Sequence, residues 1–232
     1  AYAGGRDDWQ SYILISSEDV FRTYWQWDVK WSENFVLGDD IILACSLAPS
    51  DLIPTSLSTG TFSGRFSGNG HTVTLTDDST CGLFGTNKGT IINLAVKGNI
   101  DSSVGSNMRN YSGGICAVNG GTIYGCSFEG KIYGAVCGLN NKTISNCFAL
   151  ANVKATNGQV GGIAALGKED SELQDCYFVG TVTTNANGLG VISVTSSKNC
   201  YYNKEVCQFA EEESGTIDAD PNVRNFSYTV KD

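Results

Sequence analysis

The chain has 232 residues, of which 41% are hydrophobic and 17% charged, which provides enough apolar side chains for a packed core and argues against disorder. Its formal net charge of -9 repels phosphate backbones and anionic lipids, so nucleic acid and membrane-surface partners are disfavoured. No apolar run approaches the roughly 20 residues that span a bilayer, so we expect no membrane insertion. The 28 glycines against three prolines indicate many tight corners, as in a coiled β structure.

The first predicted element is a short helix near the N-terminus. Ser16 or Ser17 can cap it, and Glu18 and Asp19 place negative charge in its first turn. Its apolar face would carry Val20, Phe21, Tyr24, Trp25 and Trp27. Because a stack of strands exposes an edge at its end, we expect this helix to cover the first coil. The segment from Phe35 to Leu43 is then predicted to form the first strands of the stack.

Two motifs alternate through the middle of the chain, and their recurrence indicates a repeat protein. The first is a short apolar segment bounded by small residues, and its copies are Gly82–Gly85, Gly113–Ala117, Gly134–Gly138, Gly161–Ala165 and Leu189–Ser193. The second is a longer segment with alternating apolar positions and, in three copies, an internal glycine. Its copies are Ile91–Ile100, Ile123–Ile132, Ile144–Val153, Leu173–Val182 and the partial copy Asn199–Tyr202.

Aligning the copies places equivalent residues in columns. The second motif aligns Leu94, Cys126, Cys147, Cys176 and Cys200, which are spaced by 32, 21, 29 and 24 residues. The first motif aligns Phe84, Cys116, Cys137, Ala164 and Ile192. A rung of about 20 to 30 residues made of short strands cannot bury its inner face alone, so neighbouring rungs must stack.

We therefore predict an all-β chain folded as a right-handed parallel β-helix with a short N-terminal capping α-helix. Residues 1–33 would form an N-terminal strand and the helix, residues 34–203 the β-helix, and residues 204–232 a C-terminal loop with a terminal strand. Leucine-rich repeats are the rival solenoid. They are disfavoured because no asparagine ladder with the Leu-x-x-Leu-x-Leu pattern is visible.

The nine cysteines are interpreted as mostly buried thiols that stack inside the fold, because a free cysteine behaves as a small hydrophobe. Zinc is disfavoured, since Cys-x-x-Cys pairs are absent and four sulfurs in a line cannot surround an ion tetrahedrally. Bridges at the ends, Cys200 with Cys207 or Cys45 with Cys81, remain open alternatives. No cofactor and no metal site are predicted.

The repeats resemble the GLUG-motif family of bacterial extracellular proteins, which is named for a Gly-Leu-apolar-Gly signature such as Gly82–Gly85. The segment Phe62–Val73 looks like the family's entry segment, and Phe35–Leu43 looks like the strand before it. The resemblance covers residues 9 to 203 and implies a parallel β-helix, a secreted or cell-surface location and an interaction role without a shared catalytic site. Ser193 and Ala135 depart from the signature at glycine positions.

Candidate catalytic residues are few. His71 is the only histidine, and the resemblance accounts for it as a turn-fixing residue of the entry segment. The pairs Asp39–Asp40 and Asp77–Asp78 and the run Glu211–Glu213 could hold calcium or act as glycosidase carboxylates, but we expect them in solvated loops or at strand ends. The repeat faces carry residues such as Asn93, Ser145, Asn146 and Asn152 with few charges. We therefore expect no catalytic cluster and no enzyme.

The favoured function is that of a secreted or cell-surface module, adhesin-like or a rigid spacer, whose partner is a host or cell-surface glycan or protein. A self-assembling extracellular filament subunit is the alternative, in which a terminal strand carrying Phe226, Tyr228 and Val230 is added to a neighbour's sheet. A polysaccharide-binding or polysaccharide-degrading β-helix is the third hypothesis. The four tryptophans would then offer stacking surfaces: Trp9, Trp25, Trp27 and Trp31.

Overall fold

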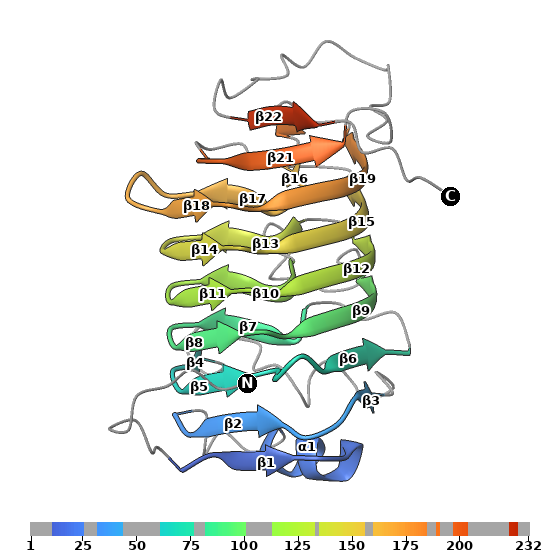
Figure 1. Ribbon diagram of the computed structural model, residues 1–232, viewed down its shortest axis with the longest axis vertical. Coiled ribbons are helices and arrows are strands. Elements are labelled where there is room, and N and C mark those ends of the chain that lie inside the picture. Colours follow the sequence, from blue (N-terminus) through green and yellow to red (C-terminus); the bar gives the residue numbers. More distant parts are fainter. Residues whose placement is uncertain are drawn as a thin grey trace.

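The computed structural model describes residues 11–25, 32–43, 61–76, 82–100, 113–132, 135–155, 160–184, 189–190, 197–203 and 223–226. These residues form one helix, α1 (Glu18–Trp25), and strands that are all parallel to their partners. The strands lie in tiers along one long axis, with α1 beside β1 at one end and β22 at the other (Figure 1).

Three parallel sheets run along that axis. Sheet A contains, in spatial order, β1 (Ile13–Ile15), β2 (Asn34–Leu37), β5 (Arg65–Ser67), β8 (Thr90–Ile92), β11 (Thr122–Tyr124), β14 (Thr143–Ser145) and β18 (Glu172–Gln174). Sheet B contains β3 (Ile41–Leu43), β6 (Thr72–Leu75), β9 (Ala95–Ile100), β12 (Ser127–Ile132), β15 (Phe148–Ala155), β19 (Tyr177–Thr184), β21 (Cys200–Asn203) and β22 (Val223–Phe226). Sheet C contains β4 (Thr61–Phe62), β7 (Phe84–Asn87), β10 (Gly113–Asn119), β13 (Ala135–Asn140) and β17 (Ala164–Gly167). A separate pair is formed by β16 (Val160–Gly161) and β20 (Leu189–Gly190).

The chain visits sheets C, A and B in turn, as in β7, β8 and β9, and then repeats the circuit one tier further along the axis. Each strand therefore pairs with its equivalent in the previous circuit, so β9 pairs with β12 and β12 with β15. This order confirms the predicted parallel β-helix. The handedness of its coil stays a prediction.

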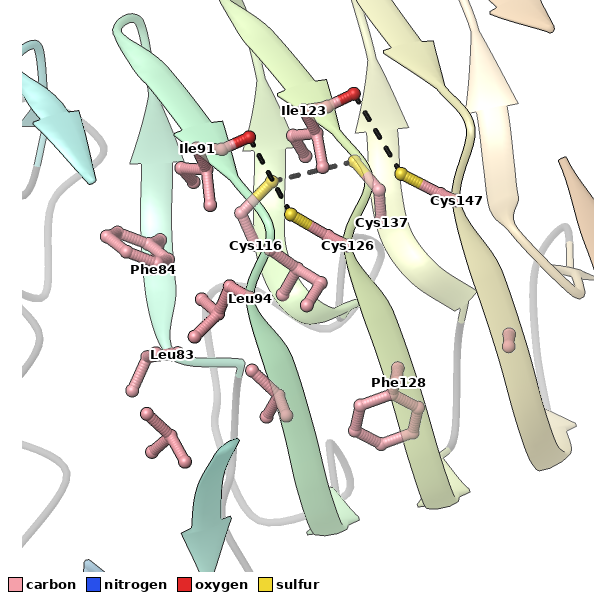
Figure 2. Packing of buried hydrophobic residues seen from close by; sticks show 14 of the residues in the cluster. Leu83, Phe84, Ile91, Leu94, Cys116, Ile123, Cys126, Phe128, Cys137 and Cys147 are labelled. Carbon is pink, nitrogen blue, oxygen red and sulfur yellow. Dashed lines mark hydrogen bonds between the residues drawn. The ribbon is translucent and has the colours of Figure 1, made fainter. Parts of the chain in front are cut away.

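The core changes in character along the axis. At the N-terminal end it is aromatic, and neighbouring rings lie 5.2 to 6.4 Å apart in the set Phe21, Phe35, Phe62, Phe66 and Phe84. Further along, smaller side chains take over, and Ile91, Ile123 and Ile144 stack in register in sheet A. Figure 2 shows this transition, with the ring of Phe84 beside the aliphatic and sulfur-bearing side chains of the next tiers.

The corner between sheets A and B requires a left-handed backbone conformation at one position per tier. That position has φ between 50° and 62° and is occupied by Asn93, Gly125, Asn146, Asp175 and Asn199. Asn, Asp and Gly are the residues that adopt this conformation at least cost. The sequence interpretation placed Asn93 and Asn146 on repeat faces. The structure corrects this, because they form the corner itself.

A buried asparagine ladder runs along the end of sheet C. The side-chain amide of Asn87 donates to Oδ1 of Asn119 at 2.8 Å, and that of Asn119 donates to Oδ1 of Asn140 at 2.9 Å. Each Oδ1 also accepts a backbone N–H two residues later in its own turn. The sequence interpretation saw no asparagine ladder of the leucine-rich-repeat type. A ladder is present here within a β-helix, without the leucine pattern.

Helix α1 covers the N-terminal end of the core. Ser17 Oγ accepts the backbone N–H of Val20 at 3.3 Å, so of the two candidate caps the structure uses Ser17. Phe21 is 1% exposed and meets the ring of Phe66, and Tyr24 packs on Phe35. The helix thus supplies the apolar surface that the first tier would otherwise expose to water.

The asparagine ladder yields a stability prediction. Replacing Asn119 with Ala removes the central amide, so Asn87 Nδ2 loses its 2.8 Å acceptor and Asn140 Oδ1 loses one of its two donors inside the fold, which should lower the free energy of unfolding by roughly 1 to 3 kcal/mol. Urea denaturation followed by circular dichroism measures the change. The matched control, exposed Asn152→Ala, should stay within roughly 0.5 kcal/mol of the parent. Equal effects of the two substitutions would show that the ladder contributes nothing.

Candidate interaction face on sheet B

The cysteine columns lie in the interior. Leu94, Cys126, Cys147, Cys176 and Cys200 are each at most 2% exposed. Consecutive tiers are joined at this column, because the N–H of Ser127 donates to Leu94 O and that of Phe148 donates to Cys126 O. In sheet C, Phe84, Cys116, Cys137 and Ala164 are register partners. Ile192, the last member predicted for this column, lies outside the described residues.

The described sulfurs are free thiols with local partners. Cys126 Sγ donates to Tyr124 O at 3.4 Å, Cys147 Sγ to Ser145 O at 3.2 Å, and the Sγ atoms of Cys116 and Cys137 lie 3.7 Å apart. Figure 2 shows the sulfurs of Cys116, Cys126, Cys137 and Cys147 in neighbouring tiers, directed into the same interior. Cys200 is a free thiol as well, so the bridge to Cys207 that the sequence left open is not formed. Cys45 and Cys81 lie outside the described residues.

Burial also controls the chemistry of these thiols. Removal from water raises the pKa of the Cys116 and Cys126 thiols well above its ordinary value, which keeps them uncharged. Since the thiolate is the reactive species, these cysteines are inert while the coil is closed. Among the described residues, no group of three or more His, Cys, Asp or Glu side chains could hold a metal ion.

The thiol ladder can be tested by its reactivity. In the folded protein, the buried Cys116 and Cys126 should resist a thiol reagent such as DTNB even at about pH 9, because removal from water raises the pKa of each thiol and keeps it protonated where a free cysteine is largely ionised. Denaturation should release both of them at once. Mass spectrometry after pulsed alkylation assigns each site. Rapid labelling of Cys116 or Cys126 in the native state would contradict the prediction.

His71 and Asp40 lie together at the start of sheet B. Their Nδ1 and Oδ1 atoms are 3.4 Å apart, and Asp40 Oδ1 also accepts the backbone N–H of Thr72 at 2.8 Å. This backbone bond, with His71 beside it, lowers the pKa of Asp40 below its ordinary value. His71 donates its own N–H to Gly68 O and therefore closes the entry turn. Asp39 instead accepts the N–H of Asp40.

The outer face of sheet B carries the exposed chemistry that sequence reasoning missed. In each tier, the residue that directly follows the buried Leu or Cys of the column points outward. These outward residues are register partners in successive tiers: Ala95, Ser127, Phe148, Tyr177 and Tyr201. The rings of Phe148 and Tyr177 are 4.3 Å apart at an angle of 30°. Two positions further along the strands, Leu150 is 42% exposed and pairs with Val179. We call the five residues Phe148, Leu150, Tyr177, Val179 and Tyr201 the apolar patch.

Charged and polar groups surround this patch. In the tiers before it, Lys97 Nζ and Glu129 Oε2 form an ion pair at 2.7 Å with both side chains half exposed. Beside it, Thr181 Oγ1 donates to Asn152 Oδ1 at 2.8 Å. At the corner, Asn199 donates to Asp175 at 3.2 Å. The ion pair of Lys97 with Glu129 thus lies on a repeat face where the sequence interpretation expected few charges.

The remaining predicted site residues lie in the C-terminal strand or outside the described residues. Of the predicted C-terminal segment the structure describes β22 (Val223–Phe226), which pairs with β21 of its own chain. Tyr228 and Val230 lie outside the described residues, as do Trp9, Trp27, Trp31, Asp77–Asp78 and Glu211–Glu213. Strand addition to a neighbour's sheet stays a prediction, because within the described residues β22 lies at the end of sheet B and pairs with β21 on one side.

Comparison with known proteins adds one structural likeness. No family model matches the chain, and no curated protein matches its sequence. A crystal structure named "putative immunoglobulin A1 protease from Bacteroides ovatus" superposes with a TM-score of 0.62 over 93% of this chain and 84% of that chain, at 18% identity. At this identity the likeness establishes the shared fold alone. No helix among the described residues is long and apolar enough to cross a membrane.

The likeness corrects one expectation. The sequence interpretation held that the chain is not an enzyme, because no catalytic cluster was visible in the repeats. The solved structure that shares the fold carries the name of a protease, so the non-enzymatic interpretation is withdrawn. Absence of a sequence motif was a weak reason, because catalytic groups of a solenoid come from separate tiers and need no motif in the chain.

Proposed function

We propose that the chain is a secreted or cell-surface β-helical module of the GLUG type that binds a surface partner through the outer face of sheet B, in an adhesin-like role. The observation that carries the proposal is the apolar patch. Aromatic side chains with aliphatic neighbours, surrounded by polar groups, are typical of the centre of a binding surface. A protein that had no use for this face would gain solubility from polar residues at Tyr177 and Leu150, which are 41% and 42% exposed.

The stacked architecture supports such a role. Patch residues come from β15, β19 and β21, and their relative positions are fixed by an unbroken ladder of backbone hydrogen bonds. Little conformational entropy is then lost when a partner binds, because the surface is already ordered. Repetition of such modules, or of the partner, would add avidity without new contacts.

The proposal predicts a face-specific loss of binding. The double variant Leu150→Glu with Tyr177→Glu should abolish attachment of labelled protein to host epithelial cells or immobilised mucin, because it places two charges in the apolar patch. Tyr124→Glu is the matched control, since Tyr124 is 47% exposed on sheet A, a different face. Flow cytometry or surface plasmon resonance measures attachment. Equal attachment of parent and double variant, or no attachment by the parent, would refute the proposal.

Proteolysis is a second candidate function, and the name of the Bacteroides ovatus structure is the observation that favours it. His71 is the chain's only histidine and has a carboxylate 3.4 Å away, so it is the one imidazole that could act as a base. This candidate predicts cleavage of immunoglobulin A1 into discrete fragments on gel electrophoresis, reduced at least about 100-fold by His71→Ala. Intact immunoglobulin after prolonged incubation would remove the candidate.

A further inference from the structure

The column that contains Phe148 changes abruptly in side-chain size. In sheet B the register partners along it are Thr72, Ala95, Ser127, Phe148 and Tyr177. Tyr177 stacks on one side of the Phe148 ring, with centroids 4.3 Å apart. On the other side the partner is Ser127, whose side chain is too short to cover a ring. The other face of the Phe148 ring is therefore directed along the axis, toward the small side chains of Ser127 and Ala95.

The space over those two small residues is bordered by hydrogen-bonding groups on both sides. Two residues further along the strands lie Lys97 and Glu129, whose ion pair at 2.7 Å leaves each side chain 49% exposed. On the corner side lies Asn93, an exposed residue whose Oδ1 sits over the backbone of Gly125. A donor on Lys97, an acceptor on Glu129 and the amide of Asn93 thus border an aromatic face and a floor of small side chains.

We propose that Phe148, Lys97, Glu129 and Asn93 form a subsite for one pyranose ring of a neutral glycan, a proposal that rests on the proposed function and names its partner. A pyranose has an apolar C–H face that can lie against an aromatic ring, and a rim of hydroxyls that both donate and accept hydrogen bonds. The Lys97–Glu129 pair offers one strong donor and one strong acceptor to adjacent hydroxyls.

The size and charge of the subsite favour a sugar over other ligands. Three tiers at about 4.8 Å and two outward positions cover a footprint on the order of 100 Å², far below the roughly 800 Å² per partner of a stable protein interface. Anionic ligands such as phosphate are disfavoured by Glu129 and by the net charge of -9. A neutral sugar ring, bound as one unit of a longer glycan chain, fits this small footprint and this negative charge.

The test uses hexasaccharides of glucose, mannose and galactose with the full chain. Saturation-transfer-difference NMR should show transfer to the sugar C–H protons in at least one of the three, and titration calorimetry should give its affinity. Phe148→Ala should abolish transfer, and Phe148→Tyr should retain it. Glu129→Gln or Lys97→Met should weaken binding roughly tenfold, the effect of losing one charge-assisted hydrogen bond. Tyr124→Ala on sheet A, with an unchanged melting temperature in every variant, is the control.

The outcomes separate this subsite from the wider function. No transfer to any hexasaccharide, or transfer unchanged in Phe148→Ala, overturns the glycan subsite. If cell attachment nevertheless depends on Leu150 and Tyr177, the interaction face stands and its partner is a protein. Inhibition of that attachment by the hexasaccharide that binds would support both proposals together.

Discussion

Parallel backbone pairing between successive tiers is the constraint on which the rest of the structure depends. Each strand of sheets A, B and C donates and accepts hydrogen bonds along the axis, so equivalent residues of consecutive circuits are held at the spacing of adjacent strands, about 4.8 Å. The same constraint puts identical chemistry in columns. It produces the thiol column inside, the asparagine ladder at the end of sheet C, and the aromatic column outside. The contacts of a residue in this fold are therefore set largely by its register partners in the two neighbouring tiers.

The interior was largely predictable from sequence because burial limits each column to a few residue types. Cys126, Cys147 and Cys176 could be aligned by eye, since a small apolar residue recurs at one place in the second motif. The N-terminal tiers were harder. Their core is built from Phe35, Phe62 and Phe66, which the sequence assigned to the first strands and the entry segment but to no recognisable repeat, so only the structure shows that their rings pack on one another.

The candidate interaction face was not predicted, although its signal is in the sequence. The residue after each aligned Leu or Cys reads Ala95, Ser127, Phe148, Tyr177 and Tyr201, which is a change from small to aromatic. The period alone cannot say that these five side chains touch, because the spacing between copies varies from 21 to 32 residues and only the register removes that variation. The asparagine ladder was not predicted for the same reason. In the sequence alone, Asn87, Asn119 and Asn140 each resemble an ordinary turn residue, and only the register shows that their side chains contact one another.

Function in such a molecule follows from the same register. A repeat that was only a spacer would need the inner columns and nothing more, whereas sheet B also holds an outer column whose composition changes along the axis, from Ala95 through Phe148 to Tyr201. The ion pair of Lys97 with Glu129 belongs to that outer face and joins residues 32 positions apart in the chain. It is therefore both part of the proposed site and a reporter of the register.

A zero-length carbodiimide cross-link between Lys97 and Glu129, identified by mass spectrometry of the native protein, tests the register most directly. The account predicts this cross-link as a major product, because the Nζ and Oε2 atoms are 2.7 Å apart. It also predicts that the product disappears when the chain is unfolded in urea before treatment. A native protein in which Lys97 joins a carboxylate of a different register, or in which both residues react without joining each other, would contradict the stacked-tier structure.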